Sequence, residues 1–553
     1  MPASTRRLTV VMPFLNEGEE VGRTVRSIRE TAGDSVDILV LNDDSDDGYD
    51  YEADLAGLGV TYLRNRHRLG AALAKERGAR LARTPYFMLL DAHMRFYEPG
   101  WADYVADELD RDSQRLLCSK SISLQKDEQG HVAPAPDSCS PQGAYLMFLS
   151  QKNVPAIDWN NYEERLPTCA ENQIPCVLGA GYATSKSYWQ KIRGLQGLVH
   201  YGCEEAYISI KAWKEGGGCY LLPRLAIGHI YRKAFPYKVH SFLYLYNYLA
   251  ISELLFPTSE RYFAKAVAWQ LNKKALHTTL EFMDTRRELN QELKACYRTL
   301  RRHDFAYVKR LNEICRKVAQ RVNRISDDEA AQAMDFLTER RQTLGGIGLF
   351  DGLAGALIAT LLYVEAGHET QESLAAELWE RLSSQLSQPH NLSFRTGLTG
   401  VGWALIYAAS HGLIEDSIDA ELALIDQQVA TLSLRRCDDL SFLDGLGGIY
   451  AYVTARLGYD RRRGLPEATF APGFLEEMDA EARRVLTDSD DWRTKNFAGQ
   501  FTERHADDWE ILAPEFPEIV ELPDYLPNDV GKWQLTLPGI VGSVINKLIN
   551  EFH

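Results

Sequence analysis

Short apolar runs alternate with helix-like patterns in the first part of the chain. Apolar and β-branched residues dominate 8–12 and 37–41, which predicts two buried strands. Two further strands are predicted over 59–63 and 86–90, with a helix over 69–82 between them. A β-α-β series of this kind favours a mainly parallel sheet, so we expect a Rossmann-like α/β domain at the N-terminus.

A glycine motif recurs in the last part of the sequence. Its copies are Phe350–Gly355, Arg395–Gly400 and Leu443–Gly448, and Leu537–Gly542 is a degenerate fourth copy. The first glycines of the three clear copies are 45 and 48 residues apart, and helical patterns fill the intervals. A period in the forties is typical of stacked helix pairs. We therefore expect an all-α repeat domain over 341–553.

The stretch between these two regions is amphipathic. From 261 to 340, charged residues alternate with intermittent apolar positions such as Leu293 and Tyr297. This pattern predicts helices with one apolar face, which we interpret as a helical connector. The predicted organisation is therefore an α/β domain over 1–260, a connector over 261–340 and the all-α domain over 341–553.

Composition narrows the class of protein. The 553 residues are 45% hydrophobic and 25% charged, which is typical of globular domains rather than disordered or fibrous chains. The formal net charge of −16 disfavours general nucleic-acid binding, although a local basic face would still permit it. The nine cysteines form no Cys-x-x-Cys pair, and neither a signal-like apolar core nor a run of about 20 apolar residues is found. We expect a soluble, cytoplasmic protein without a membrane span.

Polar clusters follow three of the predicted strands. They are Asn16-Glu17, Asn42-Asp43-Asp44 and Asp91-Ala92-His93. Ligands bind at the carboxyl ends of strands in such sheets, although Asn and Asp are also common in plain turns. A carboxylate and an imidazole two residues apart, as in Asp91 and His93, can face one cation such as Mn²⁺ with mixed oxygen and nitrogen ligands. His229 is a candidate third ligand, but taken alone it fits an ordinary half-buried histidine at a strand end better.

Four motifs occur in order within residues 8–260. They are Val11-Met12-Pro13-Phe14-Leu15-Asn16-Glu17, Leu90-Asp91-Ala92-His93, Tyr201-Gly202-Cys203-Glu204-Glu205 and Gly228-His229-Ile230-Tyr231-Arg232-Lys233. Together they resemble the motifs of the GT-A glycosyltransferases, and most closely those of the polypeptide N-acetylgalactosaminyltransferases. The resemblance implies a GT-A fold and a UDP-sugar as donor substrate.

The same resemblance implies roles for individual residues. It implies a Mn²⁺ ion held by Asp91, His93 and His229, with Arg232 beside the diphosphate. Such an ion would stabilise the negative charge that develops on the leaving UDP. The uridine would be surrounded by Pro13, Asn16, Glu17 and Asp43. The basic segment from Arg64 to Gly70 is a further candidate for nucleotide binding, and a solvated basic loop explains it equally well.

The segment that starts at Gly202 predicts a helix with Glu204 and Glu205 in its first turn. Acids in a first turn commonly just complement the helix dipole, but the flanking motifs favour a place near the metal. The family pattern is Gly-Gly-Glu-Asn, so Glu205 replaces an amide by a carboxylate. Because a carboxylate can accept a proton, we hypothesise that Glu205 is a general base and that the reaction inverts the anomeric centre.

The glycine repeats resemble the α/α-toroid of the LanC-type lanthionine synthetases, in which such repeats ring a central cavity. The cyclases of that family hold zinc with two cysteines and a histidine. Here Cys437 is the only cysteine after residue 341, and no Cys-His-Gly match exists. We therefore expect a non-catalytic toroid that supports the transferase or grips a peptide.

The sequence thus predicts a Mn²⁺-dependent glycosyltransferase, in the hexosyltransferase class, that moves a sugar from a UDP-sugar to a hydroxyl group. A peptide or protein acceptor rests on two resemblances that agree. Alternatives are a glycan, small-molecule or modified-nucleobase acceptor, or a non-catalytic protein that only binds a nucleotide sugar.

Overall fold

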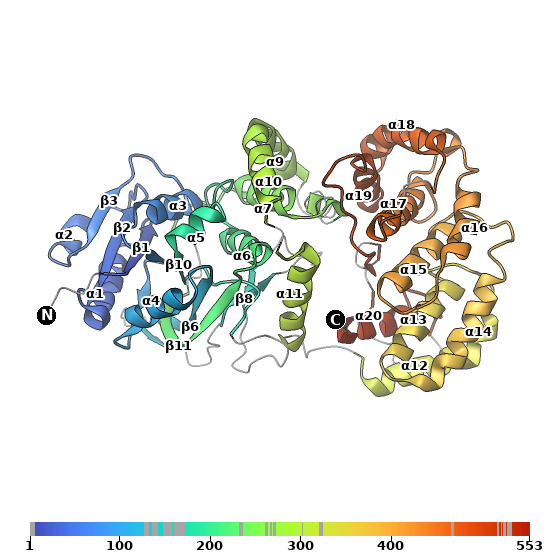
Figure 1. Ribbon diagram of the computed structural model, residues 1–553, viewed down its shortest axis with the longest axis horizontal. Helices are drawn as coiled ribbons and strands as arrows, with labels where there is room; N and C mark the ends of the chain where they lie inside the picture. The colour runs from blue at the N-terminus through green and yellow to red at the C-terminus, as the bar shows by residue number, and fades with distance from the viewer. Residues whose placement is uncertain are drawn as a thin grey trace. The chain divides into compact units, whose positions relative to one another are not determined.

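The structure is a computed structural model in which the chain forms two compact units (Figure 1). It describes residues 6–126, 132–134, 142–146, 157–159, 172–231, 236–259, 261, 264–265, 268, 273–300, 302–319, 325–465, 469–516, 519–520, 522–523, 527 and 533–552. The first unit comprises Met1–Phe256 with Leu271–Gln320, and the second comprises Pro257–Gln270 with Arg321–His553. Among the described residues, no helix has both the length and the apolar character that a membrane span requires.

The first unit is built on a mixed sheet with the strand order β3-β2-β1-β4-β10-β6-β11-β5, and β7 pairs with β6. Its strands are β1 (Leu8–Phe14), β2 (Val36–Asn42), β3 (Thr61–Arg64), β4 (Tyr86–Leu90), β5 (Met94–Arg95), β6 (Leu116–Lys126), β7 (Val132–Pro134), β10 (Gly181–Ser185) and β11 (Cys219–Ile230). A separate two-stranded sheet pairs β8 (Ala144–Leu146) with β9 (Ile157–Trp159).

The four strands expected from the apolar runs are present and run parallel to one another. The sheet as a whole is mixed: β10 runs antiparallel to both β4 and β6, and β11 runs parallel to β6 but antiparallel to β5. Every residue of β10 is buried. A strand that is buried on both faces has the same continuous pattern in either direction, so its orientation could not be inferred from the sequence.

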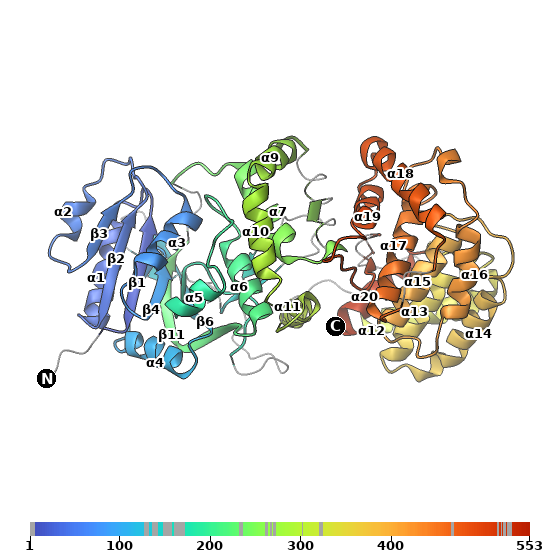
Figure 2. The ribbon, with the colours of Figure 1, turned by 45° about the horizontal axis from the view of Figure 1, so that its top comes forward.

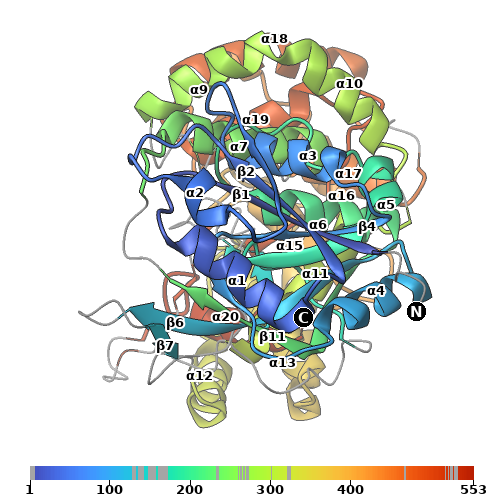
Figure 3. The same ribbon diagram turned by 90° about the vertical axis from the view of Figure 1, so that its left-hand side faces the viewer.

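Helices cover both faces of this sheet (Figure 3). On one face, α1 (Glu20–Ala32) and α4 (Trp101–Arg111) share a hydrophobic core with Val10 and Met12 of β1. The opposite face carries α3 (Ala71–Leu81), whose Gly78 lies so close to β1 that an added Cβ would be 2.2 Å from a methyl group of Val11. This layering leaves the carboxyl ends of β1, β2 and β4 at one edge of the sheet.

The remaining helices of the first unit follow at the sheet edges and in the amphipathic stretch. They are α2 (Tyr51–Leu55), α5 (Lys186–Lys191), α6 (Glu204–Glu215), α7 (Ser241–Leu255), α9 (Lys273–Thr285), α10 (Arg287–Tyr297) and α11 (Phe305–Ala319). Both α9 and α10 pack against α7, and α11 packs against α6.

The second unit is helical (Figure 2). Its helices are α12 (Asp327–Arg340), α13 (Leu353–Glu365), α14 (Glu372–Ser383), α15 (Leu398–Ser410), α16 (Asp419–Val429), α17 (Leu446–Arg462), α18 (Pro472–Asp488), α19 (Trp492–Thr502) and α20 (Ile540–Phe552), with the 3-10 turns η1 (Arg341–Thr343), η2 (Glu369–Gln371) and η3 (Leu434–Arg436). Each clear glycine motif opens one of α13, α15 and α17, and a second helix follows each of them.

The second glycine of each motif is required by a close approach to the preceding loop. A Cβ at Gly355 would lie 2.2 Å from the carbonyl oxygen of Leu349, and a Cβ at Gly400 would lie 2.0 Å from that of Phe394. Successive loops also bond to one another, because the amide of Phe350 donates to the carbonyl of Arg395. The glycine motif therefore recurs in the sequence because the same close contact between loops recurs at the start of successive helices.

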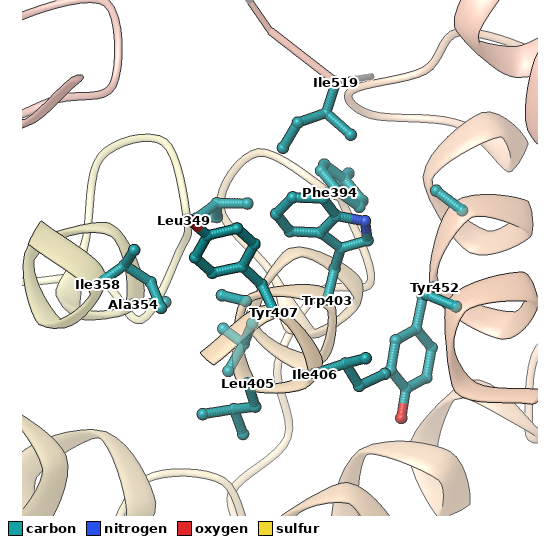
Figure 4. Packing of buried hydrophobic residues seen from close by; sticks show 14 of the residues in the cluster. Leu349, Ala354, Ile358, Phe394, Trp403, Leu405, Ile406, Tyr407, Tyr452 and Ile519 are labelled. Carbon is teal, nitrogen blue, oxygen red and sulfur yellow. The ribbon is translucent and has the colours of Figure 1, made fainter. Parts of the chain in front are cut away.

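Aromatic rings pack among aliphatic side chains in the core of this helical unit (Figure 4). Trp403 and Tyr407 stack on each other along α15, with ring centroids 5.9 Å apart. Phe516 meets both rings edge-on, and all three side chains are fully buried. Packing of this kind stabilises the unit through buried apolar area and edge-to-face contacts.

Candidate functional site

A cavity of about 500 Å³ opens at the carboxyl ends of the parallel strands. Most of the residues that the sequence singles out lie in its wall: Pro13, Glu17, Asp43, Gly70, Asp91, His93, Glu204, Glu205 and His229. The wall is assembled from the loops after β1, β2 and β4, the starts of α3 and α6, and the end of β11. Segments that are far apart in the sequence thus meet at one edge of the sheet.

Three potential metal ligands converge in this cavity. One ligand atom from each of Asp91, His93 and His229 lies within 4.8 Å of the other two. The two histidine Nε2 atoms are 3.1 Å apart, and His229 Nε2 lies 3.5 Å from a carboxylate oxygen of Asp91. His229 is brought here by strand pairing, because β11 runs antiparallel to β5 with His229 opposite Met94.

The charge states of these three side chains favour the binding of a cation. Burial raises the pKa of Asp91, but the contact with His229 and the neighbouring positive groups outweigh it and lower the pKa to about 2. Burial lowers the pKa of both His93 and His229 below the ordinary histidine value. The site therefore presents one carboxylate and two neutral imidazoles, a donor set that fits a divalent transition-metal ion such as Mn²⁺.

Asp43 is engaged with the loop that precedes α3. One of its carboxylate oxygens accepts hydrogen bonds from Asn65 Nδ2 at 2.7 Å and from the amide of Leu69 at 2.8 Å. The other oxygen accepts a bond from the amide of Gly70 at 2.7 Å. Asp43 therefore organises the loop at the cavity wall, and its side chain is 4% exposed.

Two predicted nucleotide-binding residues point elsewhere. The Asn16 side chain exchanges hydrogen bonds with Asp46, so it ties the loop after β1 to the loop after β2. Arg64 donates to the carbonyl of Ser45 and pairs with Asp44. Neither side chain is part of the described cavity wall. Arg232 lies outside the described residues.

Glu204 and Glu205 occupy the first turn of α6, as expected, and both lie in the cavity wall. Lys75 of α3 faces them, with its Nζ atom 3.6 Å from a carboxylate oxygen of Glu205. Although burial opposes its charge, the two glutamates raise the pKa of Lys75. Burial raises the pKa of Glu204 to about 7, because it outweighs the opposing effect of Lys75.

Sequence reasoning did not find Lys75. The sequence held one indication of its role. Lys75 follows Ala71, Ala72 and Ala74 in a predicted helix, and a charged side chain among small residues that face a core needs a partner of opposite charge. The contact of Glu17 with His93, described below, was missed as well. Its signal was weaker still, because an acid after a strand is usually part of a turn.

Residues 9–130 match the sequence profile described as Glycosyl transferase family 2. Human polypeptide N-acetylgalactosaminyltransferase 10 is 27% identical over 248 residues, which cover 42% of this chain and 39% of that protein. Polypeptide N-acetylgalactosaminyltransferase 5 of Caenorhabditis elegans is 27% identical over 242 residues, covering 42% and 38%. This chain therefore spans about two fifths of the length of these curated relatives.

Among solved structures, a crystal structure of GalNAc-T7 with UDP, GalNAc and Mn²⁺ aligns with a TM-score of 0.44 and 20% identity, covering 58% of each chain. The profile match and the relatives agree with the resemblance read from the four motifs. Within the first unit, residues 9–130 are thus similar to glycosyl transferase family 2, and a longer stretch is similar to the polypeptide N-acetylgalactosaminyltransferases.

Proposed function

We propose that this protein is a Mn²⁺-dependent glycosyltransferase that moves a sugar from a UDP-sugar to a hydroxyl group of a peptide or protein. The observation that carries the proposal is the convergence of Asp91, His93 and His229 in a cavity at the strand ends. Three ligands from two separate segments of the chain leave coordination positions open for a diphosphate. The names of the curated relatives support the transfer of a sugar to a polypeptide.

In this proposal, Asp91, His93 and His229 hold the ion, which supplies the positive charge that stabilises UDP as a leaving group. Asp43 and the amides it binds fix the loop at the start of α3, where Gly70 lets the backbone form part of the donor pocket. Arg232 remains the proposed partner of the diphosphate. Pro13, Asn16 and Arg64 remain proposals for the nucleotide by resemblance alone. The resemblance suggests the same role for Glu17, but its carboxylate lies against His93, which favours a role at the metal ligands instead.

Glu205 is the proposed general base. Its carboxylate lies in the wall of the same cavity as the metal cluster, and it forms an ion pair with Lys75. An added Cβ at Gly179 would lie 1.9 Å from the nearer oxygen, so Gly179 leaves room for this carboxylate. A base in this position would take the proton of the acceptor hydroxyl as the sugar is transferred with inversion.

The second unit is proposed to be a LanC-like scaffold without the zinc chemistry, which supports the transferase or holds a peptide. A truncated chain would be hard to interpret, because this unit includes residues from an earlier part of the sequence. Its Arg261 is buried and forms a 2.8 Å ion pair with Glu503. Cutting the chain at residue 341 would leave Arg261 without Glu503. A role in acceptor binding is therefore better tested with point variants of the full chain.

The proposal is tested by release of UDP from a panel of UDP-sugars, including UDP-GalNAc, with Mn²⁺ and with EDTA. Mn²⁺-dependent release that disappears in Asp91→Ala is the expected result. Asp103→Ala is the matched control, because Asp103 is an exposed acid of α4 outside the cavity wall. Release that is unaffected by EDTA, or by loss of Asp91, would remove the metal-dependent mechanism.

A further inference from the structure

The loop after β1 holds one carboxylate against the proposed metal site. Its backbone is fixed, because the amides of Glu17 and Gly18 both donate to the hydroxyl of Tyr51, at 3.0 and 2.9 Å. The Tyr51 hydroxyl in turn donates to Asp47 at 2.5 Å. These contacts fix the backbone position from which the Glu17 side chain extends.

The carboxylate of Glu17 lies next to His93. Its Oε2 atom is 3.2 Å from His93 Nδ1, and the two side chains are only 7% and 13% exposed. The opposite ring nitrogen, Nε2, is the one that faces His229. Glu17 and the metal locus are therefore on opposite sides of the same imidazole ring.

His229 is held differently. Its Nδ1 atom is buried and has no hydrogen-bond partner among the described residues. The ring is positioned by Tyr231, which meets it edge-on with centroids 4.3 Å apart and whose hydroxyl is 3.1 Å from that of Ser121. One imidazole of the cluster thus has a carboxylate at its outer nitrogen, and the other is positioned by packing.

We propose that Glu17 is a positioning residue for the metal ligand His93. A carboxylate at Nδ1 favours the tautomer with the proton on that atom, which leaves the lone pair of Nε2 to bind a cation. Such a partner also fixes the orientation of the ring and makes the imidazole a stronger ligand. This assignment rests on the proposed metal site and differs from a contact between Glu17 and the uridine.

The inference is tested by titrating the full chain with Mn²⁺ alone. Binding is monitored by electron paramagnetic resonance, in which the signal of free Mn²⁺ decreases as the ion binds. Removing a partner of this kind typically weakens metal binding by about 10- to 100-fold, so we expect Glu17→Ala to fall in that range. Glu17→Gln keeps the shape and one acceptor oxygen and is expected to lose less. Glu19→Gln is the matched control, because Glu19 lies in the same loop and pairs with Arg23 instead.

A second readout separates positioning from nucleotide contact. UDP binding measured in EDTA is expected to be unchanged in Glu17→Ala, whereas the concentration of Mn²⁺ needed for half-maximal activity rises with little change in kcat at saturating Mn²⁺. Mn²⁺ affinity equal to wild type in both Glu17 variants would overturn the inference, and so would weaker UDP binding in EDTA. Asp91→Ala serves as the reference: if it binds Mn²⁺ normally, the proposed metal site itself fails, and if it alone loses Mn²⁺, only the role of Glu17 fails.

Discussion

The side-chain amino group of Lys75 lies 3.6 Å from a carboxylate oxygen of Glu205, and neither side chain is more than 15% exposed. Glu204, the preceding residue, is 2% exposed and accepts a hydrogen bond from the amide of Gly202. One buried cation therefore lies beside one buried acid, Glu204, and one partly buried acid, Glu205. Because the pKa of Glu204 is raised to about 7, this cluster takes up a proton more readily than two ordinary glutamates would.

Lys75→Met is expected to destabilise the first unit, because it leaves two carboxylates without a positive partner. Removal of one member of a buried ion pair typically costs about 3–5 kcal/mol. The loss should be larger at pH 8 than at pH 5, since Glu204, whose pKa is raised by burial, can be neutralised by protonation at the lower pH. Hydrogen exchange of the amides of α3 and α6 measures this loss of stability at pH 5 and at pH 8. Lys75→Arg keeps the charge and is the control, and an equal loss at the two pH values would contradict the argument.

Glu204 should make stability depend on pH. Its pKa in the folded chain, about 7, is above the ordinary glutamate value of 4.5, so between these values the folded state binds the proton more tightly. The contribution is complete below about pH 4.5 and is lost as the pH rises through about 7. Glu204→Gln should remove this slope, which amounts to about 3 kcal/mol over the whole interval. The measurement is the opening free energy of α6 by hydrogen exchange from pH 5 to pH 8; parallel profiles for wild type and variant would refute the prediction.

Glu205→Gln tests the role of Glu205 as a base without changing the residues proposed to bind the donor. If Glu205 accepts the proton of the acceptor hydroxyl, its amide variant should lose about 100-fold or more in kcat. Binding of UDP and Mn²⁺ should persist, because Asp91, His93 and His229 remain in place. Glu52→Gln, an exposed position in α2, is the control for the substitution itself. The anomeric configuration of the product, read by NMR, decides the stereochemistry: retention relative to the donor would eliminate the base assignment.

The strands β1, β2 and β4 were predictable because each is an apolar run that ends in a polar cluster, and β3 was predictable from its short apolar run alone. The orientation of β10 was not, since burial on both of its faces removes any directional signal. The glycine repeat predicted where α13, α15 and α17 begin. The same sequence could not reveal that Phe516 fills the space beside Trp403, because that contact joins residues more than a hundred positions apart.

The sequence predicted those residues of the candidate site that have metal-binding side chains and directly follow a predicted strand. Asp91 and His93 are two residues apart, and their proximity follows from local geometry. His229 needed the resemblance, because its place depends on the antiparallel pairing of β11 with the short β5. The direction of a side chain depends on its partners, which is why Asn16 turns to Asp46 although its position lies beside the cavity.

The start of α3 offers a test of how tightly the cavity wall is built. Gly70 has a φ of +84°, and an added Cβ would lie 2.3 Å from the Cα of His200. Gly57 has a similar φ of +79° but nothing within 4 Å of an added Cβ. Gly57→Ala therefore carries only the cost of the left-handed backbone, about 1–2 kcal/mol.

Gly70→Ala adds a clash with backbone that cannot rotate away, and it disturbs the loop amides that bind Asp43. We expect it to cost at least about 2 kcal/mol more than Gly57→Ala, since relief of the overlap requires the backbone to shift. UDP binding should fall in Gly70→Ala and persist in Gly57→Ala. Thermal unfolding and calorimetric UDP titration compare the two variants directly. Equal effects would mean that the loop before α3 can move freely, and Asp43 would then lose its role in shaping the donor pocket.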